Sequence, residues 1–348
     1  MSLATAVRPG FEIDAAALSS WMAEHVEGFA GPLRIEQFSG GQSNPTFKLT
    51  TPSTRYVLRR KPVGQLLKGA HAVDREARVL QAVERAGLPV PHVHALCTDD
   101  EVIGSWFYVM DLVEGRILWN GGFPDLHPEQ RAAHQDAMGK VLAALHLLDP
   151  EEIGLGDYGR HGNYLQRQVA RWSRQYGEDA AAGRTADMDF LVEWLPHHLP
   201  ADSETRVVHG DYRIDNIVFY PTDAPVAAVL DWELSTLGEP AVDFAYNLMM
   251  YRVPSALPWG LADRDLGELG LPSEAEYVAA YLRRTGRAGI PHLDVYLAFN
   301  LFRLAAIIHG IKGRLIRGTA ASADAATMVE RMDLLAGIAR EIAEQVRT

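Results

Sequence analysis

The stretch "HGDYRIDN", residues 209–216, places a histidine, an aspartate and an asparagine within one short segment. It follows the apolar residues "RVV" (206–208) and precedes "IVFY" (217–220). Both flanking segments are rich in β-branched and aromatic residues, which predicts strands, so the polar stretch is expected to form a loop between them. Loops held by regular structure often carry catalytic side chains.

A further acidic residue follows at the end of the next apolar segment. Asp231 stands directly after "VAAVL" (226–230), in the triplet "DWE". Asp211, Asn216 and Asp231 thus offer oxygen donors at the ends of predicted strands, and oxygen is the ligand that Mg²⁺ prefers. An Asp followed at a short distance by an Asn, and later by a metal-binding Asp, is the order of a phosphotransferase catalytic loop. The alternative is that these residues only form unrelated Asx turns.

The residues before Gly115 predict a small antiparallel sheet. Short apolar segments are separated by tight turns, one of them at Asp99–Asp100, and one amphipathic segment over 73–87 has helical spacing and ends at Gly87. Asp14 is expected to cap an additional helix near the N-terminus. The expected strands, about five by a rough count, are 33–39, 46–50, 55–60, 92–99 and 105–113.

After Gly115 the pattern becomes mainly helical. The sequence therefore predicts an α+β fold with two lobes, a small N-terminal antiparallel sheet lobe over residues 1–112 and a larger, mainly helical lobe over 113–348. Ser322 and Asp324 are expected caps of the last helix. The expected helices are 127–149, 163–178, 186–196, 240–252, 273–286, 292–313 and 322–346.

On the residues His209, Gly210, Asp211 and Asn216, and on the "DWE" triplet, the sequence resembles the aminoglycoside phosphotransferase and choline kinase family, which has a protein-kinase-like fold. The spelling of the loop is most similar to a branch found as stand-alone bacterial proteins and, in animals, fused to acyl-CoA dehydrogenases. The resemblance implies ATP or GTP as the donor and Mg²⁺ as the metal. It also implies Asp211 as the catalytic residue that accepts the hydroxyl proton, and Asn216 and Asp231 as metal ligands.

The same resemblance implies two supporting residues for the loop. Asp243, in "GEPAVDFA" (238–245), is expected to bond the backbone of the loop, and His209 is expected to hold the loop by packing and hydrogen bonding.

A cation and a glutamate are expected to clamp the α- and β-phosphates. The segment "YVLR" (56–59) has the form of the kinase strand that carries a lysine, with Arg59 at the lysine position, and Glu76 lies on the predicted helix. Arginine also grips phosphate, with a different geometry from lysine. Arg60 and Lys61 follow directly, so the sequence leaves open which cation contacts the phosphates. Exposed surface positions are the alternative for Arg59 and Glu76.

Gly40 and Gly41 lie between two predicted strands, where backbone N–H groups can approach phosphate, and Ser43 adds a donor. The alternative for the two glycines is an ordinary hairpin.

The segment "YVMDLVEG" (108–115) fits the position that joins the two lobes. The resemblance implies that Asp111 offers its carbonyl and Val113 its N–H group to adenine, with Met110 behind the base.

The acceptor is expected to be a small-molecule hydroxyl, because few residues separate Asp231 from Asp243 and leave no room for a long activation segment. The branch resemblance implies a hydroxy-acid or a hydroxyacyl-CoA. The segment 302–318 gathers Arg303, His309, Lys312, Arg314 and Arg317, which fit either an anionic acceptor or the favourable placement of cations at a helix C-terminus. Two alternatives stay open: a kinase of aminoglycosides or other amino-alcohols, and a nucleotide-binding module without catalysis.

The composition restricts the partners. The formal net charge of -12 argues against nucleic-acid binding, which needs a basic field. The most apolar run, 295–311, contains Asn300, Arg303 and His309 and is expected to be a buried helix rather than a membrane span. A single cysteine, Cys97, and the lack of a signal-peptide pattern favour a cytoplasmic location. The oligomeric state stays open.

Overall fold

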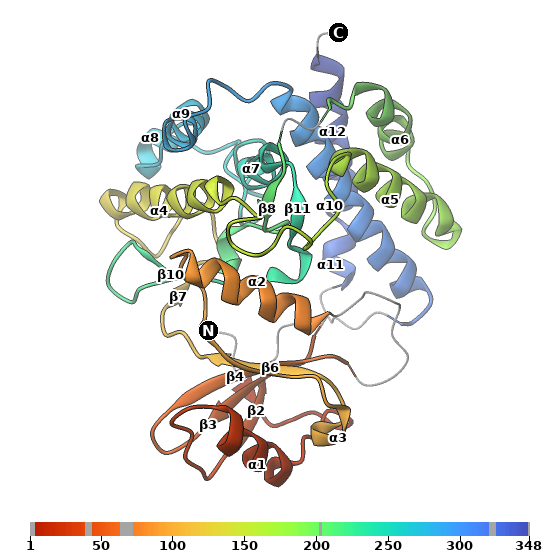
Figure 1. Ribbon diagram of the computed structural model, residues 1–348. Coiled ribbons are helices and arrows are strands. Elements are labelled where there is room, and N and C mark those ends of the chain that lie inside the picture. The colour runs from red at the N-terminus through yellow and green to blue at the C-terminus, as the bar shows by residue number, and fades with distance from the viewer. Residues whose placement is uncertain (1–3, 39–43, 63–71, 202–203, 320–324, 347–348) are drawn as a thin grey trace. The chain divides into compact units, whose positions relative to one another are not determined.

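The computed structural model divides the chain into two compact units (Figure 1). The first unit comprises Met1–Ile117 together with Ile217–Ser235, and the second comprises Leu118–Asn216 together with Thr236–Thr348. The first unit thus runs past residue 112, where the sequence placed the boundary, and also takes in a later segment. The residues that the structure describes are 4–38, 44–62, 72–201, 204–319 and 325–346.

The first unit is built on an antiparallel sheet with strand order β1-β2-β3-β4-β6-β5. The five expected strands are all present, and a two-residue strand near the N-terminus, too short to carry a pattern, pairs with β2 as a sixth. The strands are β1 (Ala4–Thr5), β2 (Arg34–Phe38), β3 (Thr46–Thr50), β4 (Arg55–Arg60), β5 (Val93–Cys97) and β6 (Phe107–Asp111).

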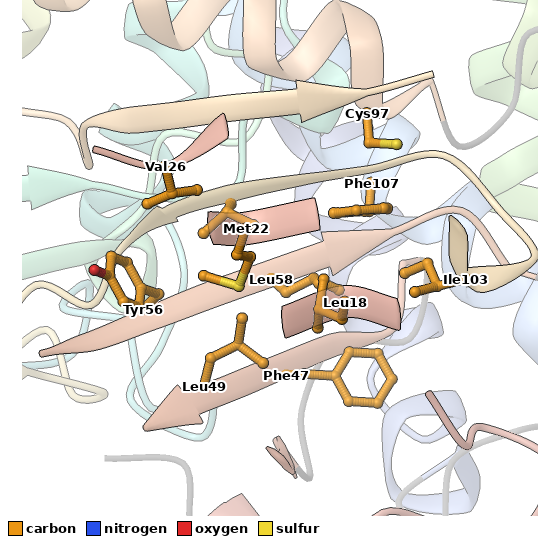
Figure 2. Packing of buried hydrophobic residues seen from close by; sticks show 11 residues of the cluster. Leu18, Met22, Val26, Phe47, Leu49, Tyr56, Leu58, Cys97, Ile103 and Phe107 are labelled. Carbon is orange, nitrogen blue, oxygen red and sulfur yellow. The ribbon is translucent and has the colours of Figure 1, made fainter. Parts of the chain in front are cut away.

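A helix covers the core of this sheet. In α1 (Ala15–His25), the carboxylate of Asp14 accepts hydrogen bonds from two backbone N–H groups of the first turn, as the sequence predicts for an N-cap. Leu18 and Met22 of this helix are fully buried against apolar side chains that alternate along β3 and β4 (Figure 2). Cys97 belongs to the same cluster and is buried.

The predicted helix over 73–87 is present as α2 (Val73–Arg85). It ends before Gly87, whose φ of 87° lies in the left-handed region that glycine adopts at little cost. The expected turn at Asp99–Asp100 is instead a single helical turn, α3 (Asp100–Ile103), capped by the side chain of Asp99.

A second sheet of the first unit combines two separate parts of the chain, in the order β10-β9-β7. It contains β7 (Arg116–Ile117), β9 (Ile217–Phe219) and β10 (Val226–Val229), followed by the 3₁₀ turn η3 (Trp232–Leu234). Pairing of β7 with β9 explains why the later segment belongs to the first unit, although the sequence assigns it to the helical lobe.

The second unit is mainly helical, as predicted. Its two short strands, β8 (Arg206–Val208) and β11 (Thr236–Gly238), pair antiparallel. In the chain, β8 precedes and β11 follows the segment that belongs to the first unit. Its helices are α4 (Pro128–Leu147), α5 (Tyr164–Glu178), α6 (Ala186–His198), α7 (Pro240–Leu248), α8 (Leu266–Leu269), α9 (Glu274–Thr285), α10 (Leu293–Ile316), α11 (Ala325–Val329) and α12 (Met332–Gln345), with 3₁₀ turns η1 (Ala180–Ala182), η2 (Ile214–Asn216) and η4 (Met249–Tyr251).

The long helix α10 forms the centre of this unit and packs on α5, α7 and α12. By length and composition it is the one helix, among the residues that were placed, that could cross a membrane, yet 83% of its apolar window is buried. Such burial is typical of a core helix, which is the predicted interpretation. The helix expected over 322–346 was wrong in detail: it is broken into α11 and α12, which both pack on α10. Its expected caps, Ser322 and Asp324, lie outside the described residues.

Candidate active site

The stretch "HGDYRIDN", residues 209–216, forms a loop directly after β8. Gly210 has a φ of 80°, a left-handed conformation that a side chain would strain, and this explains the glycine between His209 and Asp211. The loop closes with η2, which ends at Asn216 immediately before β9. The predicted strand–loop–strand arrangement is therefore present.

The backbone of the loop is anchored by Asp243 on α7. Its Oδ2 atom accepts a hydrogen bond of 2.7 Å from the N–H of His209, and its Oδ1 atom accepts one of 2.9 Å from the N–H of Gly210. The Nε2 atom of the fully buried His146 lies 3.3 Å from the same Oδ2 atom. Burial alone would raise the pKa of Asp243, but the hydrogen bonds from His146 and from the backbone of His209 oppose burial, and the pKa is lowered. The carboxylate is thus held ionised where the loop needs an acceptor.

Asp211 has a hydrogen-bond donor at each carboxylate oxygen. The amide nitrogen of Asn216 donates to Oδ2 over 3.1 Å and also to the carbonyl oxygen of Asp211 over 2.9 Å. The hydroxyl of Tyr246 donates to Oδ1 in a short hydrogen bond. Burial raises the pKa of Asp211, while the positive charge of Arg213 and the hydrogen bond from Tyr246 oppose that rise. The carboxylate is therefore fixed in orientation by a donor on each oxygen.

Two residues of this site were not predicted in their roles. Tyr246 lies three positions after Asp243 on α7, so both face the loop, and this i,i+3 spacing is the signal that could have found it. Arg303 on α10 donates a hydrogen bond of 2.6 Å to the carbonyl oxygen of Gly210, and its guanidinium lies 5.3 Å from the ring centre of Tyr246. The sequence placed Arg303 in an expected buried helix and grouped it with the other cations of 302–318, and it is indeed only 5% exposed.

Replacing Tyr246 with phenylalanine is expected to shift the acidic limb of the rate profile to higher pH. The hydroxyl stabilises the ionised form of Asp211, so its loss is expected to raise the pKa of Asp211 further. A general base acts in its ionised form, so activity at low pH is expected to be lost first. The pH dependence of kcat/KM measures the shift. The matched control is Tyr251→Phe, because the Tyr251 hydroxyl is hydrogen-bonded to Gln135 and Pro272 instead.

In the first unit, Arg59 on β4 joins three acidic residues. Its Nε atom lies 3.1 Å from Oε2 of Glu76, and its Nη2 atom lies 2.8 Å from Oδ1 of Asp231 and 2.9 Å from Oε2 of Glu233. Burial alone would lower the pKa of Arg59, but Glu76 and Asp231 outweigh burial and hold it well above its ordinary value. Burial raises the pKa of Glu76 to about 7, against the opposing charge of Arg59. The structure thus brings together the predicted Arg59 and Glu76 pair.

The two other candidate cations are engaged elsewhere in the same unit. Arg60 is buried and donates to the backbone carbonyls of Phe11 and Glu12. The Lys61 ammonium lies 3.6 Å from the ring centre of Trp106. Among the three consecutive cations, Arg59 is therefore the one beside Glu76.

Asp231 has an unusual backbone. Its φ of 63° is in the left-handed region, which a non-glycine residue adopts at a cost, and such conformations gather at functional sites. The ring nitrogen of Trp232 donates over 3.0 Å to the carbonyl of Val229 and fixes the turn that follows. The conformation aims the Asp231 carboxylate at Arg59, and one of its two oxygens takes that contact.

The remaining predicted positions can be placed only in part. Met110 and Asp111 end β6, and the Asp111 carboxylate lies 2.7 Å from Nε2 of His94. Val113 is partly exposed in the segment after this strand. Gly40, Gly41 and Ser43 lie outside the described residues.

The predicted metal ligands belong to different units, Asn216 to the second and Asp231 to the first. Their shared ion stays a prediction. Among the residues that the structure places, no group of at least three His, Cys, Asp or Glu side chains could hold a metal ion.

Comparison with known proteins gives the family. The sequence profile of the phosphotransferase enzyme family matches residues 34–299. The chain is 42% identical over 315 residues to acyl-CoA dehydrogenase family member 10 of Mus musculus, an alignment that covers 90% of this chain but 29% of that protein. The chain therefore spans less than a third of that relative's length.

Comparison with solved structures agrees with the family match. A crystal structure from Ralstonia eutropha JMP134, assigned to the aminoglycoside phosphotransferases, has 46% sequence identity and a TM-score of 0.87, with 97% of this chain and 100% of that chain covered. Spectinomycin phosphotransferase in complex with ADP and spectinomycin has a TM-score of 0.65 at 12% identity, covering 97% and 100% of the two chains, and shares the fold alone. The predicted α+β protein-kinase-like fold and the stated resemblance are confirmed. The chain belongs to the phosphotransferase enzyme family.

Proposed function

We propose that the protein transfers the γ-phosphate of ATP to a hydroxyl of a small molecule. Membership of the phosphotransferase enzyme family supports this reaction class. The single observation that carries it is the Asp211 carboxylate, held by Asn216 and Tyr246 on a loop that Asp243 anchors. The complex of spectinomycin phosphotransferase with ADP supports an adenine nucleotide, and GTP is the alternative donor.

The proposed reaction needs one proton transfer. The acceptor hydroxyl oxygen forms a bond to the γ-phosphorus, the bond from that phosphorus to the bridging oxygen breaks, and the nucleoside diphosphate leaves. Asp211 orients the hydroxyl and takes its proton late in the reaction. Because the transition state is loose, positioning and charge neutralisation supply most of the rate. Arg59, paired with Glu76, is the proposed contact of the α- and β-phosphates.

Asn216 and Asp231 are the proposed Mg²⁺ ligands. The Asn216 nitrogen is bonded to Asp211, which leaves its side-chain oxygen for a cation. Asp231 uses one carboxylate oxygen for Arg59 and is partly exposed, so its other oxygen also fits a hard cation. A bound Mg²⁺ neutralises charge on the β- and γ-phosphates.

Removal of divalent metal with EDTA is expected to abolish transfer, and added Mg²⁺ is expected to restore it. Asn216→Ala removes a proposed ligand and should raise the Mg²⁺ concentration for half-maximal rate by about tenfold or more. Asn216→Asp keeps an oxygen ligand and should need less Mg²⁺ than the alanine variant. An unchanged Mg²⁺ requirement in Asn216→Ala would remove this residue from the metal site.

The proposed acceptor is a hydroxy-acid or a hydroxyacyl-CoA, in line with the relation to acyl-CoA dehydrogenase family member 10. The amino-alcohol kinase that the assignment of the Ralstonia structure suggests is the alternative.

A panel of acceptors with γ-labelled ATP and Mg²⁺ tests the proposal. The panel contains hydroxy-acids, hydroxyacyl-CoA esters, aminoglycosides and amino-alcohols. Label on a hydroxy-acid or its CoA ester is the expected result, and label on an aminoglycoside would favour the alternative. Nucleotide binding without transfer to any class would instead support a non-catalytic nucleotide-binding module.

A further inference from the structure

A groove lined by arginines lies between α5 and α10 in the second unit, at a distance along α10 from the catalytic loop. Figure 1 shows these two helices beside each other, and they are in direct contact. The groove has a volume of about 520 Å³. Its charged lining residues are Arg171, Arg174, Glu178, Asp179, Arg314 and Arg317. Positive charge gathers here on a chain whose formal net charge is -12.

One wall of the groove belongs to the same helix as Arg303, the residue that holds the catalytic loop. Along α10, Arg303, Gly310, Arg314 and Arg317 follow one another at spacings that place them on the same face of the helix. Arg303 bonds the carbonyl of Gly210, next to the catalytic Asp211. At the usual rise of a helix, Arg314 lies roughly 16 Å farther along the axis than Arg303.

Helix α5 lies beside α10 and runs in the same direction. The side-chain nitrogen of Gln175 donates to the carbonyl of Ala306. Farther along both helices, the guanidinium of Arg317 donates to the carboxylate of Asp179. Near the start of this row, loss of water contact and the positive charges of Arg303 and Arg174 lower the pKa of Arg171. Arginines of α5 and α10 thus lie close together, and their like charges repel.

The two acidic residues of the groove balance only part of the charge of its four arginines. Both oxygens of Asp179 are taken by the guanidinium of Arg317, at 2.7 and 2.9 Å. Within the described parts of the chain, no carboxylate lies within ion-pair distance of Arg171, Arg174 or Arg314. Cations at the end of a helix favour its dipole, but this accounts for Arg314 and not for Arg171 and Arg174 in the body of α5.

We propose that this groove binds the phosphates of an acyl-CoA acceptor. The inference rests on the proposed function, and it chooses the CoA ester over the free hydroxy-acid. An acyl-CoA carries its phosphates and its acyl group at opposite ends of a long flexible arm. Arg314 in the groove and Arg303 at the catalytic loop are likewise far apart along α10. Guanidinium groups bind phosphate through paired, charge-assisted hydrogen bonds.

Calorimetric titration with coenzyme A tests the groove directly, because coenzyme A needs no phosphoryl transfer to bind. Arg171→Ala is expected to weaken binding about tenfold, and Arg171→Ala with Arg314→Ala about a hundredfold, as for charge-assisted contacts. The matched control is Arg264→Ala with Arg283→Ala, which removes the same charge from exposed positions outside the groove. The control should bind like the wild type. Dephospho-coenzyme A should bind more weakly than coenzyme A, and pantetheine should not bind.

The outcomes separate this inference from the proposed function. Loss of coenzyme A binding in the groove variants supports the groove even if no acceptor is phosphorylated. If transfer occurs but the groove variants bind coenzyme A like the wild type, the groove proposal is wrong and the proposed function is retained. Competition by ATP would place coenzyme A in the nucleotide site and overturn the groove. Binding of the groove to anionic phospholipid vesicles, without binding of coenzyme A, would overturn it as well.

In steady-state kinetics, the groove variants should raise KM for a hydroxyacyl-CoA by the same factors. KM for the corresponding free hydroxy-acid and for ATP should stay unchanged, because neither needs the groove. An equal rise of KM for the ester and the free acid would contradict the assignment.

Discussion

Replacing Asp211 with alanine is expected to lower the rate of phosphoryl transfer by about 10²- to 10⁴-fold, the usual contribution of a positioned general base. Both oxygens of this carboxylate have donors, from Asn216 and Tyr246, so its orientation is set before any substrate binds. The variant lacks the group that we propose takes the hydroxyl proton. Single-turnover transfer with labelled ATP measures the loss.

Asp211→Asn is the isosteric partner of this test. It keeps the volume and a hydrogen-bonding side chain but cannot accept the proton, and its rate should fall nearly as far as that of the alanine variant. Nucleotide affinity should stay within about threefold of the wild type, because the loss concerns a step after nucleotide binding. A variant that retains full activity would remove Asp211 from the reaction.

Replacing Arg59 with alanine is expected to destabilise the protein by about 3–5 kcal/mol, the cost of breaking a buried ion pair from one side. The side chain of Glu76 is only 3% exposed, and that of Arg59 only 12%, so the remaining carboxylate has little access to water. Asp231 and Glu233 also lose their shared cation. Urea denaturation at neutral pH measures the change in the free energy of unfolding.

The matched control for this variant lies on the same strand. Arg55 pairs with Glu114, and both side chains are about half exposed. Arg55→Ala should therefore change the free energy of unfolding by less than about 1 kcal/mol. A similar loss in both variants would mean that the buried charge is not the cause.

The effect of Arg59→Ala should depend on pH in a defined direction. Burial already raises the pKa of Glu76 from 4.5 to about 7, and removal of Arg59 takes away the charge that opposes this rise. An acid whose pKa is raised on folding favours the folded state at low pH, and this contribution is lost as pH rises through the raised value. Both proteins lose this contribution between pH 4.5 and about 7, and only the variant continues to lose it at higher pH, so the difference from the wild type should grow above about pH 7.

A second substitution separates buried charge from lost packing. With Glu76→Gln added to Arg59→Ala, no buried carboxylate remains, and more than about 1 kcal/mol of the lost stability should return. The pH dependence between 4.5 and about 7 should also disappear. If the double variant is no more stable than Arg59→Ala, the cavity left by the arginine dominates.

The catalytic loop was accessible from the sequence because its residues are close in the chain. Asp211 and Asn216 lie on one loop, and their short separation already fixes them near each other. Asp243 could be assigned through the family resemblance. The regular elements were also predictable, since apolar spacing in α2 and alternation in β3 and β4 report which face is buried.

Other features needed contacts between distant parts of the chain. The strand β1 was missed because two residues carry no pattern, and the pairing of β7 with β9 joins segments that are far apart in the sequence. Nor could the sequence tell Arg59 from Arg60. Their side chains point to opposite faces of β4, and only packing shows that Arg60 bonds carbonyls near the N-terminus.

By itself the sequence determined the family resemblance, the fold class and the loop over 209–216 as the candidate catalytic loop, because these depend on residue types at short separations. Only the tertiary structure decided that Tyr246 and Arg303 hold the loop, that Arg59 is the cation beside Glu76, and that arginines of α5 and α10 form one groove. The physical reason is that a charge or hydroxyl gains its role from its partner. A partner many residues away leaves no local pattern in the chain.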